Sequence, residues 1–294
     1  MTDNQRLEFK LHTNHMNAVI NTLVQLQELI LVKSEQDASM SEKHLTQLDA
    51  SIQLLMSSLP AEVRTLFKKM QKKDILSIVP VFNNVCTGCG LTLPVSLVYS
   101  VRAGNGLYRC NHCARILYYP EVRLRGLSKK KHSRVQPIQT GIARFSSSSL
   151  MVPLLQSNER DEAISELAFK MEKEGFVDDG ARLYDEVLQR EAVINTAVDH
   201  GIAFPHVRGV EGGGLTLALG TSSKGVKFDP TARTLTHIIF FIVIPTAASV
   251  FYLRLLSGLT QTFVRKEARD KLLSAKTANE LWTALIKTTR STIK

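Results

Sequence analysis

The 294-residue sequence lacks any apolar run long enough to cross a membrane. Its longest such run extends from Ile238 to Ile244 and stops at Pro245, far short of the ~18 residues that a membrane-spanning helix requires. The first ten residues are polar and lack the basic and then apolar pattern of a secretory signal peptide. We therefore expect no membrane span and a cytoplasmic location.

Cysteine is scarce, and all four cysteines lie in one short segment, as Cys86-x2-Cys89 and Cys110-x2-Cys113. Disulfides are disfavoured in the cytoplasm, and this spacing is typical of a zinc site with four thiolate ligands. Four thiolates close the coordination sphere, so Zn²⁺ would be structural here. The sequence predicts a small β zinc ribbon; the alternatives are unrelated core cysteines or a redox dithiol pair.

Local signals within the ribbon indicate its backbone. Gly90 relieves the turn after the first cysteine pair, whereas Ala114 stands at the matching place after the second pair, where glycine would be easier. His112 lies between two ligands and is expected to be exposed. Residues 91–102 and 107–108 flank Gly104-Asn105-Gly106, which predicts a β-hairpin.

The net charge of +10 is distributed unevenly. Residues 1–150 contain 19 Lys and Arg against 10 Asp and Glu, whereas residues 151–294 contain 18 against 17. This asymmetry indicates two units with different partners. The basic half could bind nucleic acid, an acidic protein or a membrane surface.

Two runs of apolar residues in the N-terminal region have heptad spacing: Met16, Val19, Leu23, Leu26 and Ile30, then Leu45, Leu48, Ile52, Leu55 and Leu59. Each covers about two heptads, which predicts an antiparallel helical hairpin or a coiled-coil dimer. A third helix is expected from about Pro60 to Asp74. We assign residues 1–78 to a helical coiled-coil region and 79–120 to the ribbon.

This order of helices followed by CTGCG and YRCNHCARILYY resembles the bacterial family of coiled-coil proteins with a C4-type zinc ribbon. The resemblance implies an interaction module that binds nucleic acid or protein. Residues 121–147 are expected to form a basic, serine-rich linker, whose cluster at 129–134 is either solvated or in contact with phosphates or an acidic surface. No aromatic residues alternate with its lysines, which disfavours stacking on single-stranded nucleic acid.

The remaining sequence, residues 148–294, alternates between helical and strand patterns. Apolar faces predict helices around 164–171 and 183–191, and further helices are expected at 249–263, 265–274 and 278–288. Strands are expected at 215–219 and 238–244. Together these elements indicate helices that cover a mostly buried sheet.

The stretches LYDEVLQREAVINTAVDHGIAFPHVRG, GVKFD and THIIFFIVIP resemble the enzyme IIA domain of the bacterial phosphoenolpyruvate-dependent phosphotransferase system, in its fructose/mannitol branch (type 2), which includes nitrogen-regulatory members. The most specific part comprises Arg190-Glu191, Thr196 and the loop from Gly201 to His206. The resemblance implies a multidomain protein whose last part, 148–294, is an α/β domain with helices around a mixed sheet.

The resemblance also implies that His206 accepts a phosphoryl group from a histidine phosphocarrier protein. A neutral imidazole suits this role because it is nucleophilic near pH 7. Arg190 would neutralise the phosphoryl oxygens, with Arg208 nearby, and Thr196 would donate a hydroxyl hydrogen bond.

Tyr252 occupies the position where the family has a second active-site histidine. A tyrosine can donate a hydrogen bond but cannot become cationic near neutral pH, so transfer would be slower or the phosphoryl group would not be passed on. His200 and His237 are weaker substitutes for the second histidine.

Three hypotheses follow for the function of the chain. The first is a regulatory phosphotransferase-system phosphocarrier, in which phosphate on His206 alters what the zinc-ribbon half binds. The second is a non-catalytic adaptor that retains the enzyme IIA fold. The third is a nucleic-acid-binding regulator led by residues 1–150.

Overall fold

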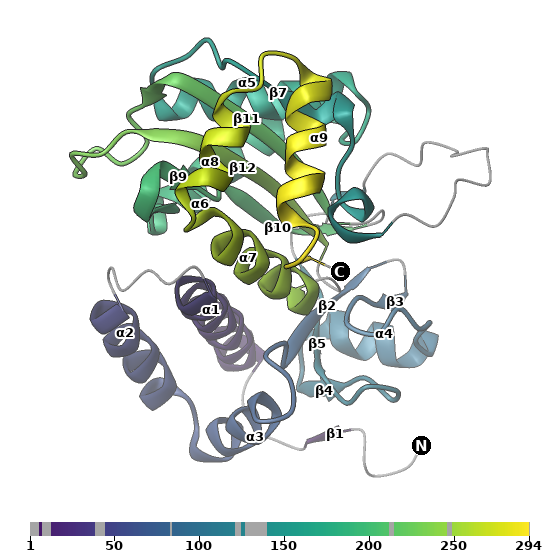
Figure 1. Cartoon of the computed structure of the whole chain (residues 1–294). Coiled ribbons are helices and arrows are strands. Elements are labelled where there is room, and N and C mark those ends of the chain that lie inside the picture. The colour runs from purple at the N-terminus through teal and green to yellow at the C-terminus, as the bar shows by residue number, and fades with distance from the viewer. Residues whose placement is uncertain are drawn as a thin grey trace. The chain divides into compact units, whose positions relative to one another are not determined.

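The computed structural model (Figure 1) describes residues 6–7, 13–38, 45–82, 84–120, 125–126, 140–211, 215–245 and 249–293. The chain divides into two compact units, which are described separately below: Met1–Asp37 with Glu42–Leu124, and Ala38–Ser41 with Arg125–Lys294. The basic cluster expected at 129–134 lies outside the described residues. None of the helices in the described part of the chain is long and apolar enough to span a bilayer.

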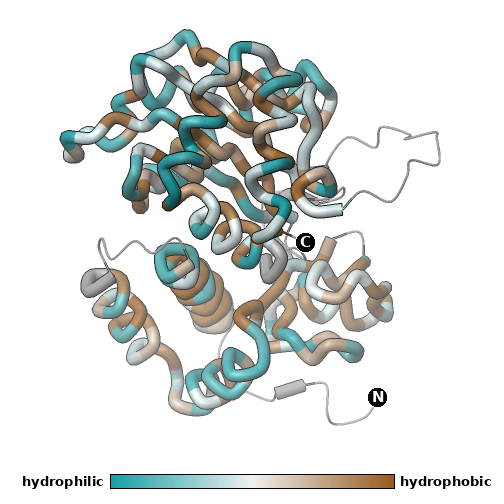
Figure 2. The backbone as a smooth tube through the Cα atoms, in the orientation of Figure 1, coloured by the Kyte–Doolittle hydropathy of each residue, from teal (hydrophilic) through white to brown (hydrophobic). Residues whose placement is uncertain are grey.

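The first unit begins with three helices, α1 (Thr13–Ala38), α2 (Leu45–Ser58) and α3 (Ala61–Gln71). In Figure 2 the α1 tube carries both hydrophobic and hydrophilic residues, as expected of a helix that buries one face. Residues of both heptad runs are buried in one cluster: Met16, Val19, Leu23, Leu26, Ile52 and Leu59. An ion pair between Lys33 on α1 and Asp49 on α2 joins the end of one helix to the beginning of the next. Within one chain, the two helices therefore adopt the hairpin alternative.

A five-stranded sheet completes this unit, in the order β1-β4-β5-β2-β3. Its strands are β1 (Arg6–Leu7), β2 (Ile78–Phe82), β3 (Val85–Cys86), β4 (Leu107–Arg109) and β5 (Ile116–Tyr118). One glutamine attaches α1 to β2: Gln27 Oε1 accepts from the amides of Ser77 and Ile78 at 2.7 and 2.8 Å, and its Nε2 donates to the Ile78 carbonyl at 2.7 Å.

The hairpin predicted across residues 104–106 is wrong in its first arm. The segment before the turn is a helix, α4 (Val95–Ala103), and β4 pairs with β5 instead. Pro94 stands directly before the helix, where a missing amide costs nothing, and Gly104 ends it in the left-handed conformation at φ 66°. Leu97, Val98 and Val101 form its buried face with helical spacing, which outweighs the β-branched content of the segment.

The second unit is built on a mixed seven-stranded sheet, as the resemblance implied. Its main path is β6-β10-β12-β11-β7, with β9 beside β12 and β8 beside β9. The strands are β6 (Arg125–Gly126), β7 (Met151–Val152), β8 (Ala197–Val198), β9 (Ile202–Ala203), β10 (His206–Glu211), β11 (Thr216–Val226) and β12 (Thr236–Pro245). The strand β12 runs parallel to β9 and β10 and antiparallel to β11.

The helices of this unit are α5 (Arg160–Lys173), α6 (Gly180–Val193), α7 (Ser249–Phe263), α8 (Lys266–Leu273) and α9 (Ala278–Thr289). They confirm the helices expected from the sequence within one or two residues at most ends. Three short 3-10 helices lie between the other elements: η1 (Gly141–Arg144), η2 (Ser148–Leu150) and η3 (Asp199–Gly201). Part of the expected linker packs on the domain, since Ile142 is buried and Ser146 Oγ donates to the Leu217 carbonyl at 2.6 Å.

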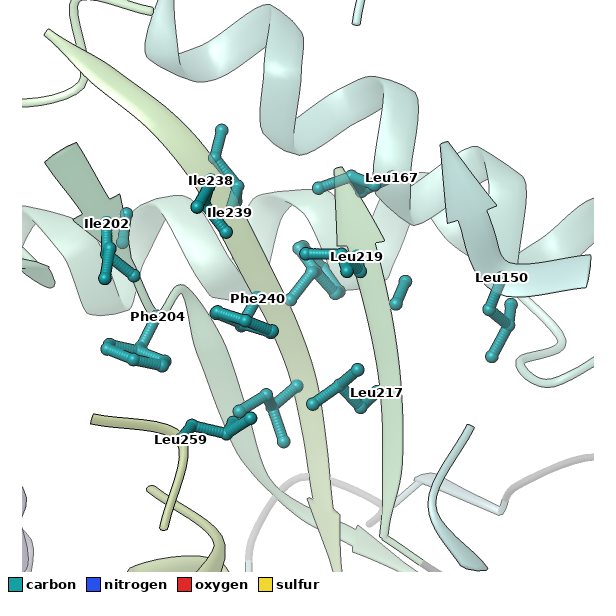
Figure 3. Packing of buried hydrophobic residues seen from close by; sticks show 14 of the residues in the cluster. Leu150, Leu167, Ile202, Phe204, Leu217, Leu219, Ile238, Ile239, Phe240 and Leu259 are labelled. Carbon is teal, nitrogen blue, oxygen red and sulfur yellow. The ribbon is translucent and has the colours of Figure 1, made fainter. Parts of the chain in front are cut away.

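The strand β12 lies at the centre of the core, and every residue from Ile238 to Ile244 is fully buried. Figure 3 shows side chains from β9, β11 and α5 gathered around it, with Phe204 beside Phe240. Those two rings stack with centroids 5.4 Å apart. The residue two positions before His206 is thereby anchored in the core.

Replacing Gln27 by leucine is expected to destabilise the first unit by about 3 kcal/mol, because it leaves three buried backbone groups of residues 77–78 without this partner. Urea unfolding followed by circular dichroism, with zinc present, measures the change. Gln25→Leu is the matched control, since Gln25 is exposed on the same helix and should change stability by less than about 0.5 kcal/mol. Equal effects of the two substitutions would contradict the assigned role of Gln27.

Candidate functional site

The four cysteines converge in the first unit, and their sulfur atoms all lie within 4.8 Å of one another. Cys86 Sγ lies 3.7 Å from Cys113 Sγ, and Cys89 Sγ lies 3.8 Å from Cys110 Sγ. Zn–S bonds of ~2.3 Å in a tetrahedron place neighbouring sulfurs ~3.8 Å apart. The donor set and its spacing therefore fit a structural Zn²⁺ ion.

The turns after the two cysteine pairs have the same backbone shape. Gly90 has φ 75° and Ala114 has φ 61°, so both residues adopt the left-handed conformation that the sequence led us to expect. Burial raises the pKa of the Cys86 thiol, so a thiolate there needs a bound cation to hold its charge. His112 is exposed, as predicted.

Arg115 connects the first cysteine turn to the segment before β2. Its Nε donates to the Leu76 carbonyl at 2.9 Å, its Nη1 donates to the Gly88 carbonyl at 3.0 Å, and its Nη2 pairs with Asp74. A Cβ on Gly88 would approach the Arg115 side chain to 2.9 Å, so the first cysteine turn needs glycine to admit the guanidinium. Sequence reasoning missed this residue.

Zinc removal is expected to unfold the ribbon, because the bound metal supplies much of the folding free energy of so small a core. The full chain should bind one zinc ion, and Cys110→Ser should lose zinc and lower the melting temperature of the first unit. Metal content by mass spectrometry and melting by circular dichroism measure both. His112→Ala, between two ligands but exposed, should keep its zinc; loss of zinc in that variant would contradict the four-thiolate site.

In the second unit, His206 is the first residue of β10 and follows a tightly bonded turn. Gly201 has φ 71°, and a Cβ there would lie 2.8 Å from the Leu235 carbonyl oxygen. The Pro205 carbonyl accepts from the Ile242 amide of β12 at 2.9 Å, and the Phe204 amide donates to the Thr196 carbonyl at 3.2 Å. The backbone before His206 is therefore fixed on both sides.

The imidazole of His206 is buried, with 1% of its surface exposed. Its Nδ1 lies 2.9 Å from the Phe204 carbonyl oxygen. A carbonyl oxygen only accepts hydrogen bonds, so this contact places the proton on Nδ1. The lone pair is then on Nε2, which is the nitrogen available for attack on phosphorus.

One tyrosine contacts both His206 and Arg208. The Tyr252 hydroxyl, on α7, lies 3.3 Å from His206 Nδ1, and the two ring centroids are 5.2 Å apart. The Arg208 guanidinium lies over the Tyr252 ring, with its Cζ 5.0 Å from the ring centroid. His206 and Arg208 thus share contact with one buried tyrosine.

A buried carboxylate supports the loop from the other direction. Glu191 Oε1 accepts from the Thr196 hydroxyl at 2.6 Å, and Oε2 accepts from the Thr196 amide at 2.9 Å. Burial raises the pKa of the Glu191 carboxyl, and the Thr196 hydrogen bonds and the charge of Arg190 offset this only in part. In this conformation the Thr196 hydroxyl is occupied by its hydrogen bond to Glu191.

The structure places Tyr252 against His206 and bonds Thr196 to Glu191, which follows Arg190 in the sequence. Arg190 Nη1 donates to the Ile194 carbonyl at 3.0 Å, at the end of α6. Sequence reasoning gave no role to Glu191, although it stands in the Arg-Glu pair. His200 is exposed with φ 67°, and His237 Nδ1 lies 2.8 Å from the Ser222 carbonyl, so neither occupies the position of Tyr252.

Comparison with known families matches the part of the chain around each site. Residues 145–288 match the family model described as "Phosphoenolpyruvate-dependent sugar phosphotransferase system, EIIA 2", and residues 85–117 match "C4-type zinc ribbon domain". A segment that matches a C4-type zinc ribbon is therefore followed in this chain by a longer segment that matches an EIIA 2 domain.

Each individual relative matches only part of this chain. The "PTS system fructose-specific EIIA component" of Haloferax volcanii is 33% identical over 101 residues, which are 34% of this chain and 66% of that protein. The "PTS system fructose-specific EIIABC component" of Bacillus subtilis is 28% identical over 127 residues, 43% of this chain and 20% of that protein. The solved structure of nitrogen regulatory protein IIA-Ntr from Neisseria meningitidis has 25% identity and a TM-score of 0.44, covering 49% of this chain and 98% of the other. The chain thus spans less than two thirds of the length of both curated relatives.

The buried Glu191 predicts a pH dependence of stability in the second unit. The folded protein keeps the Glu191 proton to a higher pH than the unfolded chain, whose carboxyl titrates near 4.5. Stability should therefore fall as the pH rises from about 4.5 through the raised pKa. Glu191→Gln should lack this loss. Urea unfolding of both proteins at a series of pH values measures the difference, and parallel curves would contradict it.

Proposed function

We propose that the C-terminal domain is a phosphotransferase-system phosphocarrier that accepts a phosphoryl group on His206 from a histidine phosphocarrier protein. The observation that carries this proposal is the contact of 2.9 Å between His206 Nδ1 and the Phe204 carbonyl. It supports Nε2 as a nucleophile with an unshared electron pair. The donor chemistry would place the reaction in the cytoplasm.

In the proposed step the Nε2 lone pair of His206 attacks the phosphorus of the donor phosphohistidine. A new N–P bond forms, the donor N–P bond breaks, and its electron pair returns to the donor imidazole. The proton on His206 Nδ1 stays in its hydrogen bond to Phe204. Such a transfer needs positioning and charge stabilisation more than covalent chemistry, for which we propose Arg190, Thr196 and Tyr252.

Access is the main requirement that this step adds. Nε2 is buried in the present conformation, so the donor can reach it only after the surrounding groups move. Thr196 would likewise have to release Glu191 to donate to a phosphoryl oxygen. The proposed carrier therefore opens before transfer, as is common for sites that exclude water.

We propose a regulatory role, with four segments: helices to residue 78, ribbon at 79–120, linker at 121–147 and phosphocarrier at 148–294. Phosphorylation adds close to two negative charges to the neutral half of a chain whose other half is basic. The ribbon half would bind a protein or nucleic-acid partner, and the charge on His206 would change that binding. A coiled-coil dimer is a further possible state of the helices.

The same burial of His206 favours a second candidate, an adaptor that keeps the fold without accepting phosphate. Tyr252 supports it too, since a phenol cannot supply the positive charge of a second histidine near pH 7. A third candidate, a nucleic-acid-binding regulator, is favoured by the basic first half. Transfer to His206 distinguishes the first candidate from the second.

The first candidate predicts that His206→Gln abolishes phosphorylation, because the substitution removes the imidazole nitrogen that accepts the phosphoryl group. The full chain is incubated with phosphoenolpyruvate, enzyme I and the histidine phosphocarrier protein, and intact mass spectrometry detects the acid-labile adduct. His200→Asn is the matched control, since asparagine tolerates the positive φ of that exposed position and labelling should persist. Labelling of His206→Gln, or an unlabelled wild-type protein that is folded, would reject the proposal.

A further inference from the structure

The regular part of β10 places Arg208 on the same side of the sheet as His206. Residues 206, 207 and 208 pair in sequence with 242, 243 and 244 of β12, and the register shifts only after Arg208. Side chains two positions apart on a regular strand point to the same face, with ~7 Å between their Cα atoms. An arginine side chain can span this distance.

Tyr252 contacts both the Arg208 guanidinium and the His206 imidazole. The Arg208 Cζ lies 5.0 Å from the centroid of the Tyr252 ring, and this ring lies 5.2 Å from the His206 ring, measured between centroids. A cation over an aromatic face is held more weakly than a guanidinium that is paired with a phosphoryl group. A phosphoryl group on His206 would therefore compete with the Tyr252 ring for Arg208.

We infer that Arg208 binds the phosphoryl oxygens of phosphorylated His206 and moves from the face of Tyr252 to do so. This inference rests on the proposed phosphocarrier function and adds a catalytic residue to it. Tyr252 then acts as a positioning residue, which keeps the guanidinium beside the imidazole before transfer. Arg190, in contrast, donates to the Ile194 carbonyl at the end of α6.

Arg208 would bring to the site a positive charge that Tyr252 cannot provide. Tyr252 cannot carry a positive charge near neutral pH, whereas a guanidinium always carries one and can bind two phosphoryl oxygens at once. Arg208 therefore supplies charge where the position of Tyr252 cannot. The electron pair and proton of the transfer step are unchanged, because Arg208 only donates hydrogen bonds to oxygens.

The test measures the rate of phosphorylation and the lifetime of the adduct in the full chain with the same donor system. Arg208→Gln should slow phosphorylation by about tenfold or more and shorten the lifetime of the adduct, as loss of one charged donor does at other transfer sites. Arg208→Lys keeps the charge without the planar fork and should recover part of both. Arg254→Gln removes a charge from an exposed position of α7 and should change the rate by less than about twofold.

A spectroscopic measurement separates direct contact from a structural role. The Nε–H resonance of Arg208, shifted by the Tyr252 ring, should move on phosphorylation of the wild-type protein. Normal labelling of the wild type with an unaffected Arg208→Gln variant, or an unmoved Arg208 resonance, would overturn the inference alone. A folded wild type that is never labelled would instead reject the phosphocarrier function, and the inference with it.

Discussion

The hydrogen bond between His206 and the Phe204 carbonyl is the contact on which the chemistry of the second unit depends. It fixes the imidazole tautomer, and it works only because the carbonyl itself is held still. Phe204 stacks on Phe240 of the central strand, and its amide donates to Thr196. Pro205 has no amide to compete, while its carbonyl accepts from Ile242. The nucleophile is thus tied to the centre of the sheet through three consecutive residues.

The first unit has a different constraint, because its hydrophobic core is small. Its apolar residues divide into two clusters, one between the helices and the sheet and one around the cysteines. The ribbon cluster is completed by the metal site and by Arg115, which reaches Leu76, Gly88 and Asp74 at once. Loss of either would leave short strands of two to five residues with little to hold them, so metal and guanidinium act together.

Sequence patterns predicted the parts that rest on periodicity and spacing. Local composition predicts the buried strand at 238–244, the last three helices and the cysteine pairs. The segment at 95–103 was misjudged, because its β-branched residues favour a strand while Pro94, Gly104 and the burial of Leu97, Val98 and Val101 favour a helix. Tertiary packing decided between them. Composition alone could not reveal that Gln27 attaches α1 to β2.

At the histidine site, sequence indicated which residues to examine but not which atoms they contact. The resemblance indicated His206 as the phosphoryl acceptor, and the structure adds that the neighbouring carbonyl selects its tautomer. Nothing in the spacing of Glu191 and Thr196 reveals that the carboxylate accepts both hydrogen bonds of the threonine. Tyr252 contacts both His206, 46 positions before it in the chain, and Arg208, 44 positions before it. Only the folded structure can show such long-range contacts.

Long-range ¹H–¹⁵N correlation spectra of the histidine rings, recorded before and after phosphorylation, test the central claim most directly. We predict that unphosphorylated His206 carries its proton on Nδ1, and that the phosphoryl group then couples to Nε2. A proton on Nε2 in the resting protein, or phosphorus bonded to Nδ1 or to another residue, would contradict the assignment of Nε2 as the nucleophile.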